Sequence, residues 1–184
     1  MTNARLTLHT AILGLGVCVT AGLVHAAEPI TTETHHFTEV RNGIYLAQTT
    51  ARVFNSNALV IVNEADVVVV DSHVTPAKAR DLIASIKELT PKPITALINS
   101  HFHWDHAHGN QEFPDVPIIG HEYTHGKLST APLDEPTYRS GLEGNAATLV
   151  RVKEQIAAAT DDEERENLEI YLAMFAAHAK DFDE

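Results

Sequence analysis

Short apolar runs separated by polar turns follow the first 36 residues and predict β-strands. Residues 37–49 (FTEVRNGIYLAQT) place Asn42 and Gly43 between two such runs, which is typical of a β-hairpin with a tight turn. Residues 58–71 (ALVIVNEADVVVVD) contain two nearly continuous β-branched runs around a second polar turn. Strands without polar alternation are usually buried on both faces, so we expect layers above and below this sheet.

A helical period follows the second pair of strands. Thr75 and Pro76 are typical of an N-cap and a first helical residue. The apolar residues that recur on one face of the predicted helix are Leu82, Ile83, Ile86 and Leu89. Pro91 and Pro93 end this helix, and residues 94–98 (ITALI) predict another buried strand. The alternation of strand and helix indicates an α/β fold.

The C-terminal part has a different pattern. Residues 145–159 and 167–180 have helical periods, and residues 160–163 have the residue types of a capping box between them. Residues 141–145 contain two glycines and look like a loop before the first of these helices. We therefore predict a helical hairpin insertion, residues 134–184, whose many acidic side chains are solvated.

The N-terminal segment predicts export. Arg5 precedes an apolar run and Ala26 lies at a small-residue cleavage site, so residues 1–26 are predicted to be a secretory signal peptide. The run is short for a transmembrane helix, so no stable membrane insertion is expected. A retained anchor and a lipoprotein attached at Cys18 are the alternatives. After cleavage the protein would be periplasmic or secreted, without its only cysteine, and its metal ligands would be His, Asp or Glu.

The net charge of the chain argues against some classes of binding partner. The formal net charge is −12 at pH 7. Such an acidic chain is a poor partner for nucleic acid or for an anionic membrane. The charge indicates little else, and the expectation of a small-molecule substrate rests on the histidine-rich motif and the resemblance described below.

The densest group of chemically active side chains is NSHFHWDHAHGN, residues 99–110, directly after a predicted strand. His101 and His103 alternate in sequence, so in an extended or looping segment they can converge on one cation. Asp105 and His106 come next, where a turn can direct both at a second cation. Imidazoles and a carboxylate suit zinc, and two zinc ions about 3.5–4 Å apart can share a hydroxide. A histidine-rich surface loop without a metal is the alternative.

The order of these segments resembles the metallo-β-lactamase superfamily of metallohydrolases. The resemblance covers residues 37–121 and rests on the strand that ends at Asp71, the following helix, and the H-x-H-x-D-H motif after the next strand. It implies the N-terminal half of a four-layer αββα sandwich, residues 37–130, to which the helical hairpin is added. It also implies an exported, zinc-dependent hydrolase that uses a metal-bound hydroxide, with a β-lactam, lactone, thioester or other ester as substrate.

The resemblance also implies a role for each residue of the motif. His101 and His103 would bind the first zinc ion, and Asp105 and His106 would bind the second. Asp105 would in addition orient the attacking water and accept its proton. Asp71 would support the metal loop from outside the ligand shell.

The second half of that fold has no counterpart in the chain. In the family, histidines and often a bridging aspartate from the second half complete the two metal sites. The third ligand of the first metal usually lies in a Gly-His-Thr-like segment, and no such segment follows residue 119. His178 lies among alanines in a predicted helix and is interpreted as a helix-surface residue. We therefore expect an N-terminal fragment, whose exposed apolar sheet face would favour association, including a homo-oligomer.

Two other functions remain open. His121, Glu122 and His125 match H-E-x-x-H, the signature of zinc peptidases, which requires a continuous helix. Gly120 and Gly126 flank this motif and leave scarcely more than one helical turn, which makes a peptidase the weaker hypothesis. A non-catalytic metal-binding or interaction protein is the other alternative, because the H-x-H-x-D-H cluster could hold one ion without turnover.

The remaining histidines carry weaker expectations. His35 and His36 lie near the new terminus and are expected to be solvated. His73 lies close to the motif as a polar filler, with a metal ligand or a substrate contact as the alternative, and His108 is expected to flank the loop. Trp104 is expected to pack against the underside of the loop or to form a pocket wall.

Overall fold

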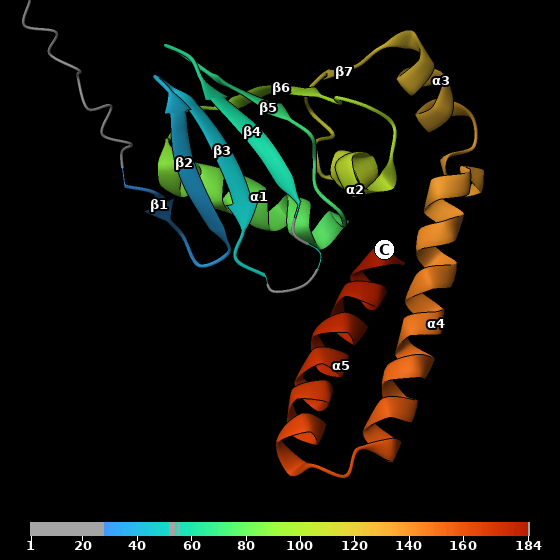
Figure 1. Ribbon diagram of the computed structural model, residues 1–184. Coiled ribbons are helices and arrows are strands. Elements are labelled where there is room, and N and C mark those ends of the chain that lie inside the picture. Colours follow the sequence, from blue (N-terminus) through green and yellow to red (C-terminus); the bar gives the residue numbers. More distant parts are fainter. Residues whose placement is uncertain (1–27, 52–53, 55, 184) are drawn as a thin grey trace, which may run out of the picture.

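The computed structural model describes residues 28–51, 54 and 56–183 (Figure 1). The predicted signal peptide, residues 1–26, lies outside these residues. No helix in the described part of the chain is long and apolar enough to cross a membrane.

A single seven-stranded sheet carries the fold, and its strands lie side by side in chain order. The first five strands pair antiparallel, as the hairpin pattern predicts, whereas the last three pair parallel. The strands are β1 (Ile30–Thr31), β2 (His35–Arg41), β3 (Ile44–Thr49), β4 (Asn57–Val62), β5 (Val67–Val70), β6 (Ile94–Ile98) and β7 (Ile118–Ile119). The turn between β2 and β3 needs Gly43, which has a φ of +73° and lies too close to the Val62 carbonyl for any side chain.

Five α-helices and two 3-10 helices complete the described part of the chain. They are α1 (Pro76–Leu89), α2 (Trp104–Ala107), η1 (His108–Glu112), α3 (Glu122–Thr130), η2 (Pro132–Asp134), α4 (Pro136–Ala158) and α5 (Asp162–Phe182). The predicted start of α1 is confirmed, since the Thr75 side chain accepts a hydrogen bond from the Lys78 amide. The sheet, with α1 on one face, confirms the predicted α/β fold class.

The two faces of the sheet differ in burial. On the face covered by α1, Val60 and Val69 pack with Leu82 and are fully buried (Figure 1). On the other face, Leu59 is 36% exposed and its register neighbour Val70 is only partly buried. The prediction that both faces are buried is therefore wrong for the described residues. The reason is that a continuous apolar run shows which strands can be covered, but not which layers are present.

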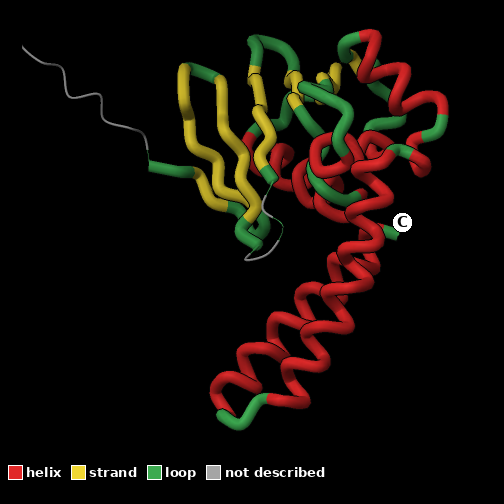
Figure 2. The backbone as a smooth tube through the Cα atoms, turned by 45° about the vertical axis from the view of Figure 1, so that its right-hand side comes forward, coloured by secondary structure: helices red, strands yellow, loops and turns green. Residues whose placement is uncertain are grey.

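The helical hairpin projects from the body of the molecule, with α4 and α5 side by side (Figures 1 and 2). Residues 141–145 were expected to form a loop but lie inside α4. A Cβ at Gly141 would lie 3.1 Å from ring atoms of both Trp104 and Phe182, so the glycine permits close packing there. The N-cap of α5 is Asp161, one residue later than the predicted capping box begins.

Candidate metal centre

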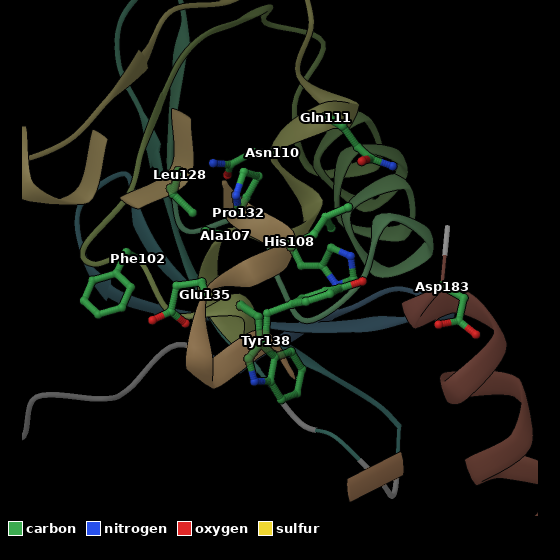
Figure 3. Close-up of a pocket in the computed structure, with 12 residues that line it drawn as sticks. Phe102, Ala107, His108, Asn110, Gln111, Leu128, Pro132, Glu135, Tyr138 and Asp183 are labelled. Carbon is green, nitrogen blue, oxygen red and sulfur yellow. The ribbon is translucent and has the colours of Figure 1, made fainter. Parts of the chain in front are cut away.

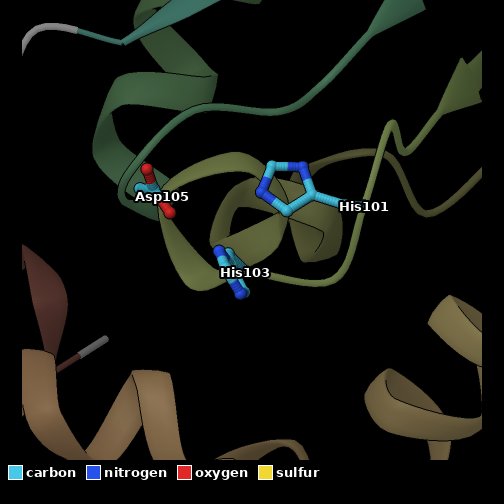
Figure 4. Close-up of side chains that lie close together, drawn as sticks. All are labelled: His101, His103 and Asp105. Carbon is cyan, nitrogen blue, oxygen red and sulfur yellow. The ribbon is translucent and has the colours of Figure 1, made fainter.

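The histidine-rich loop follows β6 at the end of the parallel part of the sheet, where ligand sites of α/β proteins are usually found. Three side chains of this loop converge (Figure 4). One potential ligand atom from each of His101, His103 and Asp105 lies within 4.8 Å of the other two. Among the described residues, this is the one group of three or more His, Cys, Asp or Glu side chains with such a spacing. Their alternation in sequence directs them to the same side of the loop.

Asp71 anchors the loop from the end of the neighbouring strand. Its carboxylate accepts hydrogen bonds from the Ser100 amide at 2.8 Å, from the Ser100 hydroxyl at 2.7 Å and from His106 Nδ1 at 2.9 Å. Burial alone would raise the pKa of Asp71, but the bonds from His106 and Ser100 together lower it. Asp71 also has a φ of +66°, an uncommon conformation for a residue other than glycine, of the kind found at functional sites.

These hydrogen bonds assign the tautomers of two histidines. His106 Nδ1 must carry the proton that Asp71 accepts, so Nε2 is the unprotonated nitrogen when the ring is neutral. Ser100 gives its hydroxyl proton to Asp71 and therefore accepts from His101 Nδ1, 3.0 Å away. The Nε2 atoms of both histidines are then free to bind a metal. An outer carboxylate that fixes the tautomers of metal ligands is a common feature of zinc sites.

His106 lies beside the three-residue group. Its Nε2 is 3.4 Å from the Asp105 carboxylate, and its ring centroid is 4.3 Å from that of His101. The hydrogen bond to Asp71 raises the pKa of His106. Burial, then the neighbouring His106 and His103, lower the pKa of His101 and favour its neutral, metal-binding form. The four residues of the motif therefore lie together. The sequence placed Asp105 with His106 on a second ion, whereas in the structure Asp105 groups with His101 and His103.

Several residues that the sequence did not indicate hold the backbone of the loop. The Ser72 amide donates to the His106 carbonyl at 2.8 Å, and the Ser56 hydroxyl donates to the Asp105 carbonyl at 3.1 Å. Asn99 and Asn110, at the two ends of the loop, exchange hydrogen bonds through their side-chain amides at 3.0 and 2.8 Å. The only sequence signal for the last pair was its position on either side of the motif.

The H-E-x-x-H segment has a different geometry. His121 precedes the first residue of α3 and acts as its N-cap, with its Nδ1 accepting from the Tyr123 amide. The helix continues through Gly126 to Thr130, so the prediction of little more than one turn is wrong. His121 and His125 are nevertheless not in the metal-compatible group found among the described residues.

Other histidines lie in unexpected places. His35 was expected to be solvated but is fully buried against His73, so that prediction is wrong, whereas His36 is exposed. His178 was expected on the helix surface but is 7% exposed and stacks on Phe54, with ring centroids 3.5 Å apart. Their burial depends on contacts between distant segments, which local sequence patterns do not reveal.

Comparisons with known proteins gave one family match and several similar solved structures. The family model of the metallo-beta-lactamase superfamily matches residues 51–173. Similar solved structures include a metallo beta lactamase from Erythrobacter litoralis with beta mercaptoethanol in the active site, at 20% sequence identity and a TM-score of 0.49. Another is a metallo beta lactamase from Hirschia baltica, at 22% identity and a TM-score of 0.44.

The matches to these two structures are partial. They cover 54% and 51% of this chain, and 47% and 46% of the respective structures. The chain thus spans about half the length of either protein. No curated protein matches the chain.

Proposed function

Because this chain belongs to the metallo-beta-lactamase superfamily, we propose that it acts as a zinc-dependent hydrolase of small ester-like or amide-like substrates. The observation that carries the proposal is the convergence of His101, His103 and Asp105 within 4.8 Å at the end of the parallel strands. His106 completes the proposed ligand set. Family membership supports metal-dependent hydrolysis in general, and the donor set supports zinc.

The residues fit zinc by their chemistry. Neutral imidazole nitrogens and a carboxylate are usual zinc ligands, whereas magnesium and calcium prefer oxygen donors. The hydrogen bonds of Asp71 leave Nε2 free on His101 and on His106, as binding requires. When bound, zinc lowers the pKa of a water molecule and polarises a carbonyl or ester oxygen.

The side chains of the chain supply the remaining functions. The Asp105 side chain is 44% exposed, so it can reach the attacking water, orient it and accept its proton. Asp71 is buried and acts as a positioning residue, because it holds His106 and the Ser100 backbone together. Two zinc ions at this site are part of the proposal.

Export and substrate class are further parts of the proposal. The pattern of residues 1–26 supports a signal peptide and therefore a periplasmic or secreted enzyme. A β-lactam, lactone, thioester or other ester would suit the proposed chemistry. The partly exposed apolar face of the sheet, including Leu59, is a surface on which copies of the chain could associate.

The test compares two pairs of histidines in the full chain. In one variant His101 and His103 are both changed to Ala, and in the matched control His121 and His125 are both changed to Ala. Zinc binding is measured by calorimetry, and hydrolysis is measured with chromogenic esters and a chromogenic β-lactam. We expect the first variant to lose both zinc binding and hydrolysis, and the control to retain both.

Each outcome separates the hypotheses. Loss of activity in the control, with the first variant intact, would support the peptidase and overturn the proposed site. Zinc binding by the wild-type chain without hydrolysis of any substrate in the panel would support the non-catalytic metal-binding protein instead.

A further inference from the structure

A cavity lies beside the metal loop, and none of the proposed zinc ligands lines it (Figure 3). It has a volume of about 360 Å³ and lies where the loop meets η2, the start of α4 and the end of α5. Phe102 and Trp104 line it, and they alternate in sequence with His101 and His103, which do not. The cavity is therefore separate from the metal centre, although the two share one segment of backbone.

The walls of the cavity are largely apolar and aromatic. Besides Phe102 and Trp104, Leu133 and Tyr138 line it. The rings of Trp104 and Tyr138 both pack on Phe182, with centroids 4.8 and 5.0 Å from it, so these two walls are supported from behind. Apolar walls with a few polar groups at one end are typical of small-molecule sites.

Three polar side chains, those of His108, Tyr138 and Asp183, lie toward one end of the cavity. In Figure 3 the ring of Tyr138 extends toward His108 and Asp183, whereas Phe102 and Glu135 lie at the opposite end. His108 Nδ1 lies 3.2 Å from the Val74 carbonyl, so it carries the proton and leaves Nε2 as an acceptor.

Asp183 adds a negative charge to this end. Its side chain is exposed. Burial is the larger cause that raises the pKa of Tyr138, and the negative charge of Asp183 is the second cause. An acceptor nitrogen, a hydroxyl and a carboxylate together suit a ligand with several hydrogen-bond donors and a positive charge. Aromatic faces such as that of Trp104 also attract cations.

We propose that this cavity binds a small organic ammonium ion, a protonated amine carried on an aromatic or aliphatic body. The body would lie against Phe102, Trp104 and Leu133, and the ammonium group would face His108 and Asp183. An anion would meet the carboxylates of Asp183 and Glu135, and a neutral ligand would leave Asp183 without a counter-charge. The net charge of −12 also favours the approach of cations.

The test uses three probes of matched shape with the metal-free full chain: 2-phenylethylamine, 2-phenylethanol and phenylacetate at neutral pH. Trp104 is the only tryptophan of the chain, so its fluorescence reports binding in this cavity, and calorimetry gives the affinity. We expect the amine to bind about tenfold more tightly than the alcohol, the effect of one charge-assisted hydrogen bond. Phenylacetate should bind most weakly.

Two variants locate the charge. Asp183→Asn should weaken amine binding about tenfold and leave alcohol binding unchanged. Glu166→Gln removes one charge from an exposed position elsewhere on α5 and should change neither. Equal binding of amine and alcohol, equal effects of the two variants, or no binding of the amine would overturn the proposal. Because the measurement needs neither zinc nor turnover, these outcomes are independent of the proposed hydrolase activity.

Discussion

Two pairs of histidines in this molecule have different surroundings. His101 and His103 are partly exposed at the end of the sheet, with ring centroids 4.7 Å apart and a carboxylate beside them. His35 and His73 are fully buried between β2 and the start of α1, with their Nε2 atoms 3.1 Å apart. No carboxylate completes a metal-compatible group with the buried pair among the described residues.

Hydroxyl groups and the hydrogen bond between the two rings hold the buried pair in place. His35 Nδ1 lies 2.9 Å from the Thr34 hydroxyl and 3.2 Å from the Ser85 hydroxyl. Burial lowers the pKa of His35 to about 4 and that of His73 to about 3, so both rings are neutral near pH 7. One Nε2 atom then donates a hydrogen bond to the other, so neither Nε2 atom of the pair is available to a metal.

The availability of Nε2 decides what each histidine can do. In the loop, Asp71 and Ser100 occupy Nδ1 of His106 and His101 and leave Nε2 available. In the buried pair, the Nε2 atoms of His35 and His73 satisfy each other. The same side chain is therefore a candidate ligand in one region and a structural element in the other.

The largest expected difference is in stability. His35→Ala would leave His73 Nε2 unpaired in a buried position and create a cavity. We expect a loss of about 3 kcal/mol in the free energy of unfolding, measured by denaturant titration. Zinc affinity should change by less than about twofold, since the loop hydrogen bonds of Asp71 remain.

His103→Ala is the matched control for this change. His103 is partly exposed, so we expect the metal-free variant to unfold within about 0.5 kcal/mol of the wild type, while zinc affinity falls sharply. If His35→Ala reduced zinc affinity as strongly as His103→Ala, the division into structural and ligand histidines would be wrong.

An effect that is smaller for each histidine is expected from pH. Unfolded histidines bind protons below about pH 6.5, whereas folded His35 and His73 stay neutral until about pH 4 and about pH 3. Between these values the unfolded state binds more protons, so the free energy of unfolding decreases as the pH falls. We expect a loss of about 2 kcal/mol per histidine between pH 6.5 and pH 5.

The variant with His35→Phe and His73→Asn isolates this contribution, because asparagine tolerates the φ of +72° at position 73. Its stability should depend less on pH than that of the wild type when both are measured by denaturant titration. Identical pH profiles would show that the buried pair is not the source of the effect.

Local signals explain what the sequence predicted correctly. Thr75 and Pro76 set the start of α1 through their own backbone geometry, and Asn42 and Gly43 formed the predicted hairpin turn. Family membership and the α/β fold class followed from similar local signals, since the motif beginning at His101 lies directly after a strand. In each case the relevant residues are close in sequence.

Contacts between distant segments explain the errors. His35 and His73 are 38 residues apart, and neither position has a local pattern that requires burial. Gly141 has low helix propensity, but its packing against Trp104 and Phe182 places it inside α4. The hydrogen bonds of Asp71 likewise join two strand ends, so the sequence could suggest its supporting role but not the tautomers that it fixes.

Asp71→Asn tests this last inference with the smallest expected effect. Asparagine tolerates the φ of +66° and keeps the shape of the side chain, but it lacks the charge that holds the proton on His106 Nδ1. We expect zinc affinity to fall about tenfold, at the lower end of the range for outer partners of zinc ligands, and the pKa of His106 in the metal-free protein to fall.

Nuclear magnetic resonance of the metal-free protein would follow the protonation of His106, and calorimetry would give the zinc affinity. Asp66→Asn is the control, because Asp66 is a partly exposed residue before β5 and accepts a hydrogen bond from Asn63. An unchanged pKa of His106 in Asp71→Asn would refute the tautomer assignment. A lowered pKa of His106 with unchanged zinc affinity would instead show that Asp71 fixes the tautomer but that the tautomer does not limit zinc binding. Exposure alone would then explain why the loop histidines, and not the buried pair, are candidate ligands.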